Sequence, residues 1–324
     1  MMDQFDESRE AFLGFSQYYH DSLHAGLLGL DMERRAAVKT FFKWVVIGFA
    51  IGLGGFLITR YMGYGEAGFF VGFIGVVFGL FMADKGMAKV RVKTKTHLVG
   101  GICNYVGLAF EAEVFTPLDL SRMRELKLLP GATRQKFEDQ ISGKAHGADF
   151  ILHEAHLERK SRNNKNNNYV TVFRGILMTL DFPSDFSGTT LILRERFLQT
   201  KRKGKLKRVG LADPVFEKAF EAYGSDQVEA RYLLTPTFME RLIDLETIFS
   251  GKNLRAAFDG GQLMIIIEAG NQFEVGSMFK TLMQRKRTDK LIEEIGLIFD
   301  IVDTVLKPAA NRIDYKSKLP TKGT

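Results

Sequence analysis

The chain has 324 residues, and its 45 Lys and Arg side chains against 38 Asp and Glu give a formal net charge of +7. A hydrophobic fraction of 45% and a charged fraction of 26% are typical of a globular protein, and they exclude a disordered or collagen-like chain. Cys103 is the single cysteine, which excludes an intrachain disulfide and a cysteine-rich metal site.

Residues 5–30 predict an amphipathic helix, because their apolar side chains recur at spacings of three and four. The stripe consists of Phe12, Phe15, Tyr19, Leu23, Leu27 and Leu30. Such a helix could lie on a membrane or dock on the rest of the protein, and the pattern is compatible with both. We assign residues 1–40 to a cytoplasmic helical segment whose first part is too polar and acidic for a cleavable signal peptide.

Two apolar stretches follow. Residues 44–59 contain no charged side chain, and residues 67–83 contain neither a charged nor a hydrogen-bonding one. Helices over 41–60 and 64–83 would each be about 30 Å long, enough to cross a bilayer core. We therefore predict a transmembrane helical hairpin over residues 41–83. The alternative, a hairpin buried in a soluble core, fits poorly with two consecutive stretches that offer a core nothing polar.

Basic residues flank the hairpin on both outer sides, whereas the turn between its helices carries only Arg60. They are Arg34, Arg35, Lys39 and Lys43 before it, and Lys85, Lys89, Arg91, Lys93 and Lys95 after it. This distribution predicts that both termini are cytoplasmic.

The glycines of the hairpin form one stripe on each helix, at spacings of three and four. They are Gly48, Gly52 and Gly55 on the first helix, and Gly68, Gly72, Gly75 and Gly79 on the second. Stripes without side chains let helix backbones approach closely in membranes. The two stripes either face each other within one hairpin, or one of them mediates homo-oligomerisation.

Residues 84–308 predict a cytoplasmic α+β domain, because strands and helices come in blocks and do not alternate strictly. Helices are expected over 85–111 and 134–141, and strands over 150–159, 169–182 and 189–199, the last of which could turn back at Gly204 through residues 205–209. Helices from Pro214 and Pro236 and a hairpin over 254–268 follow. A C-terminal helix is expected to end at Pro308, leaving residues 309–324 as a flexible tail. The predicted fold class is thus an α+β cytoplasmic domain preceded by a two-helix transmembrane hairpin.

Three stretches carry a family resemblance. They are residues 172–183 (VFRGILMTLDFP), 213–242 (DPVFEKAFEAYGSDQVEARYLLTPTFMERL) and 258–267 (FDGGQLMIII). The chain resembles, over roughly residues 85–305, a family of uncharacterised bacterial membrane proteins with a domain of unknown function, some of them labelled galanin-like. The resemblance implies a two-span protein of the bacterial inner membrane with a cytoplasmic α+β domain, and it supplies no catalytic residues. Some members are encoded near LemA-type membrane proteins, which implies a protein of that type as a partner.

The densest group of metal-ligating residue types contains His146, His153 and His156. The motif HEAH is not the HExxH of zinc proteases. On a strand, His153 and His156 would point to opposite faces, so we expect one packed and one exposed histidine and no metal site. No GxSxG, Walker A or GxGxxG motif is present, and we expect neither catalytic residues nor a cofactor.

Two charged features remain. Glu229 and Arg231 lie two residues apart on a predicted helix and are expected to bond elsewhere as structural anchors. A basic ribbon, defined as Arg194, Arg196, Lys201, Arg202, Lys203, Lys205, Lys207 and Arg208, could be a solvated hairpin tip or a site for anionic lipids. Nucleic acid is disfavoured as a partner, because residues 201–208 include no aromatic side chain for base stacking.

These observations favour a non-catalytic protein whose cytoplasmic module binds a partner or the membrane surface. A membrane-associated, metal-dependent hydrolase using the region from His146 to His156 is the alternative, and an RNA-binding membrane anchor is a second one.

Overall fold

The computed structural model describes residues 4–114, 118–145, 148–161, 168–181, 186, 188–194, 206–211 and 214–317. The chain divides into two compact units. The first, the hairpin unit, comprises Met1–Ile102 and Glu274–Leu291; the second, the sheet unit, comprises Cys103–Phe273 and Ile292–Thr324.

The hairpin unit begins with short helical pieces: η1 (Glu10–Phe12), α1 (Phe15–Tyr18) and η2 (Tyr19–Leu23). The expected single helix over residues 5–30 is interrupted at Gly14, whose φ of 83° is left-handed. The predicted apolar stripe is nevertheless buried from Phe12 to Leu27. Tyr18 Oη donates to the main-chain oxygen of Gly101 at 3.3 Å, so this segment docks on the third α-helix of the chain.

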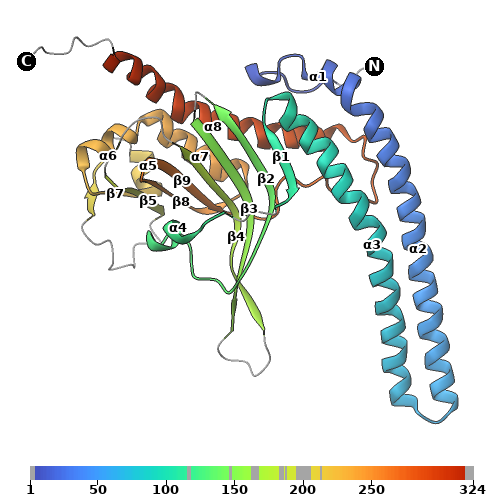
Figure 1. Cartoon of the computed structure of the whole chain (residues 1–324). Helices are drawn as coiled ribbons and strands as arrows, with labels where there is room; N and C mark the ends of the chain where they lie inside the picture. The colour runs from blue at the N-terminus through green and yellow to red at the C-terminus, as the bar shows by residue number, and fades with distance from the viewer. Residues whose placement is uncertain are drawn as a thin grey trace, which may run out of the picture. The chain divides into compact units, whose positions relative to one another are not determined.

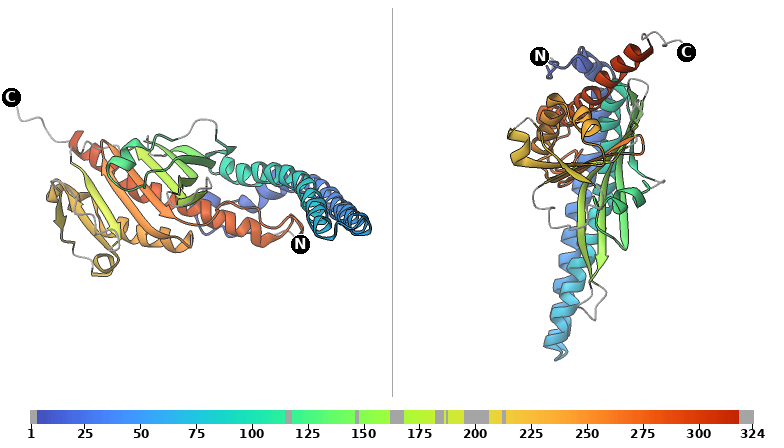
Figure 2. Two further views of the ribbon diagram at one scale, coloured as in Figure 1. Left: turned by 90° about the horizontal axis from the view of Figure 1, so that it is seen from below. Right: turned by 90° about the vertical axis from the view of Figure 1, so that its left-hand side faces the viewer.

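Two long helices form the body of this unit, α2 (His24–Tyr61) and α3 (Gly65–Tyr105). They run side by side in opposite directions, as Figures 1 and 2 show from three sides. The turn between them passes through Gly63 at a φ of 85°. The helix expected to reach residue 111 ends at Tyr105, because the chain turns at Gly107, with φ 77°, into a strand.

The sheet unit is built on a nine-stranded sheet in which every pairing is antiparallel, in the order β1-β2-β3-β4-β9-β8-β5-β7-β6. Its strands are β1 (Ala109–Glu113), β2 (Arg134–Ala145), β3 (Ala148–Lys160), β4 (Tyr169–Asp181), β5 (Thr190–Arg194), β6 (Lys207–Val209), β7 (Phe220–Gly224), β8 (Lys252–Asp259) and β9 (Gln262–Glu268). Its helices are α4 (Ser121–Glu125), α5 (Pro214–Ala219), α6 (Gln227–Leu233), α7 (Pro236–Ile248) and the greater part of α8 (Arg285–Ser317).

Both faces of this sheet are covered, with α4 on one side and α7 and α8 on the other (Figure 2). On the first face, Leu120 and Met123 join a core cluster with Leu157, Phe173 and Leu177 of the central strands. On the second face, Phe238 of α7 packs on Phe258 of β8 with ring centroids 5.4 Å apart. A strand that is buried on both faces consists of consecutive apolar residues. Leu263–Ile267 is an example, because all five of its side chains are buried.

Several predicted elements are confirmed. Strands β3 and β4 pair along almost their whole length, and β8 and β9 form the expected hairpin through Gly260 and Gly261, with φ of 59° and 78°. Thr235 caps α7, its hydroxyl accepting the N–H of Phe238 at 3.2 Å, with Pro236 in the first turn. The architecture is that of two long apolar helices followed by a sheet-rich domain containing helices.

Three expectations were wrong. The segment predicted as a helix over residues 134–141 is strand β2, whose side-chain alternation is broken by a bulge where Asp139 adopts a φ of 52°. Strand β6 pairs with β7 and not back on β5, which lies between β8 and β7. Helix α8 does not end at Pro308 but continues to Ser317, since a proline removes one helical hydrogen bond without removing the rest.

Candidate membrane-spanning hairpin and its polar base

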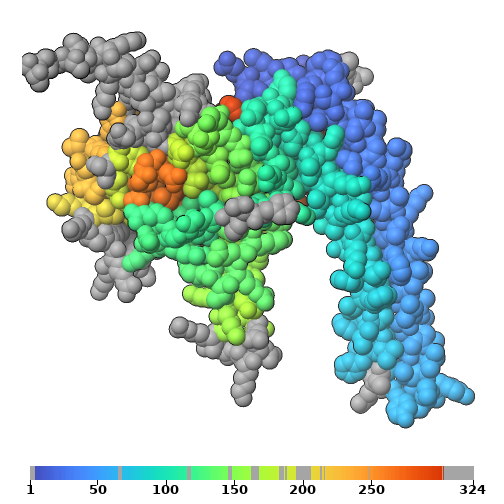
Figure 3. Space-filling model, in the orientation of Figure 1, coloured from blue at the N-terminus to red at the C-terminus, as the bar shows by residue number. Residues whose placement is uncertain are grey.

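Large apolar side chains cover the outside of α2 and α3 between residues 42 and 81. They are Phe42, Val46, Phe49, Ile51, Leu53, Leu57 and Ile58 on α2, and Phe69, Phe70, Phe73, Ile74, Phe78, Leu80 and Phe81 on α3, and all of them are exposed. Only 11% and 22% of the most apolar 18-residue windows of the two helices are buried. Figure 3 shows this stretch at the surface of the hairpin unit. A hairpin in the core of a soluble protein would bury these residues, whereas this one leaves an apolar band that none of the described residues of the unit covers.

The glycines place the two helix backbones in direct contact. A Cβ atom built on Gly48 would lie 2.7 Å from the Cα atom of Gly79, and one built on Gly75 would lie 2.8 Å from the Cα atom of Gly52. The same holds nearer the turn, where a Cβ atom built on Gly68 would lie 3.1 Å from the main-chain oxygen of Phe56. Both stripes therefore face each other within one chain, which is the first of the two arrangements that the spacing allowed.

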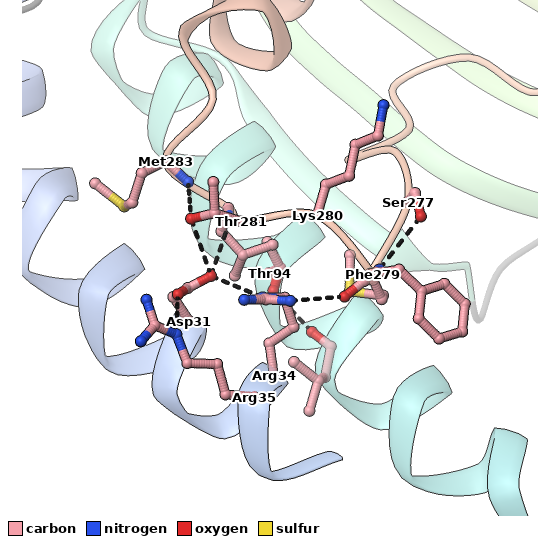
Figure 4. A network of polar contacts seen from close by, with 12 residues as sticks. Asp31, Arg34, Arg35, Thr94, Ser277, Phe279, Lys280, Thr281 and Met283 are labelled. Atoms are coloured by element: carbon pink, nitrogen blue, oxygen red, sulfur yellow. Dashed lines mark hydrogen bonds and ion pairs between the residues drawn. The ribbon is translucent and has the colours of Figure 1, made fainter. Parts of the chain in front are cut away.

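A polar network lies on α2 before the predicted span (Figure 4). Asp31 is 3% exposed and Arg34 is 7% exposed. Asp31 Oδ1 accepts from Arg34 Nε at 2.7 Å and from the main-chain N–H of Leu282 at 2.9 Å, and its Oδ2 accepts from Arg35 Nε at 3.0 Å. Arg34 Nη1 donates in turn to the main-chain oxygen of Met278 at 3.0 Å. The two side chains therefore bind the backbone of a segment near the other end of the chain.

The ionisation of Asp31 follows from these contacts. Burial by itself raises the pKa of this carboxyl group, but the hydrogen bonds from Arg34, Leu282 and Arg35 outweigh it and hold the pKa well below its usual range. Asp31 is thus an anion between two guanidinium groups at neutral pH.

A second buried arginine holds the same segment from its C-terminal side. Arg287 of α8 is 8% exposed and donates to the main-chain oxygens of Val275, Ser277 and Lys280, the last at 3.2 Å. Burial lowers the pKa of Arg287, and the nearby charge of Arg34 lowers it further. We call residues 275–283 the clamped segment, because Asp31, Arg34 and Arg287 bind its backbone at five points.

The clamped segment presents one aromatic side chain outward. Phe279 is 52% exposed, and in Figure 4 its ring points away from the polar network. It packs against two rings of α2, with centroids 5.3 Å from Phe41 and 6.2 Å from Phe42. Sequence reasoning missed this arrangement, since no local pattern links residues so far apart in the chain.

The predicted histidines lie in different environments. His153 is 2% exposed and packs edge-on against Phe137, with centroids 5.7 Å apart, and burial lowers its pKa to about 4. His156 is half-buried, with Nε2 2.8 Å from the hydroxyl of Thr171. His146 lies outside the described residues. Within the ranges that the structure describes, no group of three or more His, Cys, Asp or Glu side chains could hold a metal ion.

The basic ribbon falls largely outside the described residues, which include only Arg194, Lys207 and Arg208 of its eight members. Arg194 makes three contacts within the sheet unit. It pairs with Glu246, donates to the main-chain oxygen of Ala219 at 3.1 Å, and its guanidinium carbon lies 4.3 Å from the ring centroid of Phe220. Lys207 and Arg208 are exposed on β6. Arg194 therefore has a structural partner that the charge pattern did not reveal.

The expectation for Glu229 and Arg231 is confirmed. Glu229 Oε2 accepts from the main-chain N–H of Gly188 at 2.9 Å, and Arg231 Nε donates to the main-chain oxygen of Gly210 at 3.2 Å. Each side chain thus binds the backbone of a different loop, as a structural anchor does.

Arg122 and Asp259 form an ion pair that the sequence did not signal. Arg122 donates to both carboxylate oxygens of Asp259, at 2.6 and 2.8 Å, and the hydroxyl of Thr189 donates to the same carboxylate at 2.6 Å. Burial by itself raises the pKa of Asp259, but these hydrogen bonds outweigh it and keep the pKa below its ordinary value. The pair joins α4 to the end of β8.

Two adjoining hollows open on the sheet unit, with volumes of about 470 and 400 Å³. They share Lys252, and the exposed cations Arg174 and Lys218 border one each. The acids at their walls are already engaged, since Glu268 accepts from Asn253 at 2.7 Å and Glu246 pairs with Arg194. Both hollows are open, and the larger one is lined by Thr171, whose hydroxyl lies 2.8 Å from Nε2 of His156.

Comparison with known protein families finds one matching domain. A domain described as "Protein of unknown function (DUF3137)" is found at residues 171–307, which lie mostly in the sheet unit. No curated protein matches the chain. Among solved structures, the mycobacterial trehalose monomycolate transport factor A is similar over 66% of this chain and 95% of its own, at 10% identity and a TM-score of 0.33.

Proposed function

We propose that this protein is a membrane-anchored binding module: α2 and α3 cross a bilayer as a two-span hairpin, and the sheet unit binds a partner on the cytoplasmic side. The apolar band on the outside of the hairpin carries this proposal. Its side chains include Phe49 at 63% exposure and Phe73 at 63%, and the backbone groups in the interior of a long helix are hydrogen-bonded within the helix. A lipid environment is the solvent that such a surface requires.

The orientation rests on the flanking charges. Lys and Arg residues precede the first predicted span and follow the second, whereas the turn around Gly63 carries only Arg60. Such a distribution keeps the basic ends of the hairpin in the cytoplasm. Both termini and the sheet unit are then cytoplasmic, and the family resemblance supports a bacterial inner membrane as the location.

Cysteine accessibility in the full chain tests insertion and orientation together. In a Cys103→Ser background, Met62→Cys places a thiol in the turn, where Met62 is 63% exposed. Glu240→Cys places a matched thiol on the exposed surface of α7. We expect a membrane-impermeant maleimide to label Met62→Cys in spheroplasts and Glu240→Cys only after lysis. Labelling of both before lysis, or of Met62→Cys only after it, would contradict the proposed topology, and release of the chain from membranes by alkaline carbonate would contradict insertion.

A further inference from the structure

The clamped segment contributes an aromatic group at the point where α2 enters its predicted span. Phe279 packs on Phe41 and Phe42, and the predicted span begins at Phe41. Phe42, Val46 and Phe49 are all exposed and follow one another at spacings of four and three, so they share one face of the helix. Phe279 therefore extends the apolar band at its cytoplasmic end.

The exposure of Phe279 belongs to a fixed turn and not to a loose loop. The carbonyl of Met278, directly before it, accepts from buried Arg34 at 3.0 Å, and the carbonyl of Lys280, directly after it, accepts from buried Arg287 at 3.2 Å. Gly276, with a φ of 73°, provides the left-handed conformation that starts the turn. Met278 itself is 2% exposed, so the turn buries one large apolar side chain and presents the next one outward.

The charges around the three phenylalanines match a membrane interface. Lys39, Lys43 and Lys280 are all exposed, and each lies within two residues of one of the three phenylalanines in the sequence. Lysine side chains beside aromatic rings are typical of the headgroup level, where the ring is buried and the ammonium group reaches water or phosphate. Each such cation near an anionic leaflet adds attraction.

We propose that Phe279 inserts into the lipid interface beside Phe41 and Phe42, which makes the clamped segment a third membrane contact contributed by the C-terminal part of the chain. This inference rests on the proposed insertion of the hairpin. The ligand is the bilayer itself, at the level between headgroups and acyl chains. Asp31, Arg34 and Arg287 act as positioning residues that fix the height of the ring.

Tryptophan quenching in the full chain tests this contact. Trp44 is the single tryptophan, so a Trp44→Phe background has no tryptophan fluorescence. One newly introduced tryptophan then reports its own depth in the bilayer. Phe279→Trp is the test, Phe49→Trp reports the middle of the span, and Val228→Trp, at a side chain 76% exposed on α6, reports the sheet unit. Each variant is reconstituted in neutral vesicles whose lipids carry bromine either near the headgroup or deep in the acyl chain.

We expect Phe279→Trp to lose emission with shallow bromine and much less with deep bromine, Phe49→Trp to show the reverse, and Val228→Trp to lose none. Quenched Phe49→Trp with unquenched Phe279→Trp would overturn the inference and leave the hairpin anchor intact. Unquenched Phe49→Trp would instead overturn the insertion on which both rest. A spin label on Phe279→Cys in a Cys103→Ser background measures the same depth through its accessibility to oxygen, and exclusion of oxygen there would also overturn the inference.

Discussion

The guanidinium of Arg34 donates to the main-chain oxygen of Met278 at 3.0 Å across a sequence separation of 244 residues. The same side chain bonds Asp31 through Nε at 2.7 Å, so one buried arginine joins its own helix to the clamped segment. The hairpin unit therefore forms completely only when residues 274–291, which are far from α2 in the sequence, pack against it.

Arg34 and Arg35 form a matched pair for measuring this contact. Both bond Asp31, but the side chain of Arg34 is 9% exposed and that of Arg35 is 69% exposed. We expect Arg34→Gln to destabilise the protein by about 3–5 kcal/mol, because it leaves a buried carboxylate and a main-chain oxygen without their strongest partner. Arg35→Gln should cost less than about 1 kcal/mol, since an exposed pair contributes little.

Thermal unfolding of the purified full chain in detergent measures the difference, and protease cleavage within the clamped segment locates it. Arg34→Gln should open this segment to cleavage well below the unfolding temperature, and Arg35→Gln should not. Equal effects of the two substitutions would contradict the role given to the buried contact.

The helix crossing of the hairpin makes a separate prediction. Gly79→Leu places a side chain where a Cβ atom alone would lie 2.7 Å from the Cα atom of Gly48, whereas a Cβ atom on Gly54 would meet nothing within 4 Å. We expect Gly79→Leu to separate the helices and lower the unfolding temperature, and Gly54→Leu to be close to neutral. Crosslinking between cysteines on the facing sides of α2 and α3 checks the separation, and unchanged crosslinking in Gly79→Leu would contradict the packing.

The basic ribbon can be tested in the assembled protein. Gly210→Cys, at an exposed position next to β6, carries an environment-sensitive dye in a Cys103→Ser background. We expect the dye emission to shift in anionic but not in neutral vesicles and the shift to fade with salt, because each cation near such a leaflet contributes on the order of 1 kcal/mol within a Debye length of roughly 10 Å.

Replacing the six cations of residues 201–208 by Gln should abolish that shift without changing the unfolding temperature, because exposed charges such as Lys207 and Arg208 contribute little to stability. They are Lys201, Arg202, Lys203, Lys205, Lys207 and Arg208. A dye that responds equally to both lipid compositions would identify the ribbon as a solvated surface.

The sequence predicted those parts of the fold whose signal is local. Residues 44–59 and 67–83 are apolar without interruption, so the two long helices could be placed before the structure was known. The hairpin at Gly260 and Gly261 was equally clear, because two glycines between apolar runs predict a tight turn. Strand β2 was mistaken for a helix, since the bulge at Asp139 disturbs the period of two that marks a strand.

The candidate site could not be predicted in the same way. Asp31, Arg34 and Arg35 look like ordinary flanking charges, and only the chain's return through Met278 and Leu282 turns two of them into buried anchors. Phe279 is one of 28 phenylalanines in the chain, and its contact with Phe41 is a tertiary relationship that no spacing encodes.

His153 makes the last prediction, because it is a buried titratable group in an apolar setting. Its Nδ1 atom is buried and has no hydrogen-bond partner in the described part of the chain, and burial lowers its pKa from 6.5 to about 4. Between these two pH values the unfolded chain binds a proton that the folded chain does not, so stability falls as the pH falls. The shift corresponds to a loss of up to about 3 kcal/mol.

Replacing His153 by Leu should remove this pH dependence, because leucine can pack against Phe137 without binding a proton. His156→Ala serves as the control: its ring is half-buried and bonds Thr171 at 2.8 Å, and we expect it to keep the wild-type pH dependence. Unfolding temperatures of the full chain in detergent, measured from pH 7 down to about pH 4.5, distinguish the two. A wild-type slope retained in His153→Leu would show that another group carries the proton.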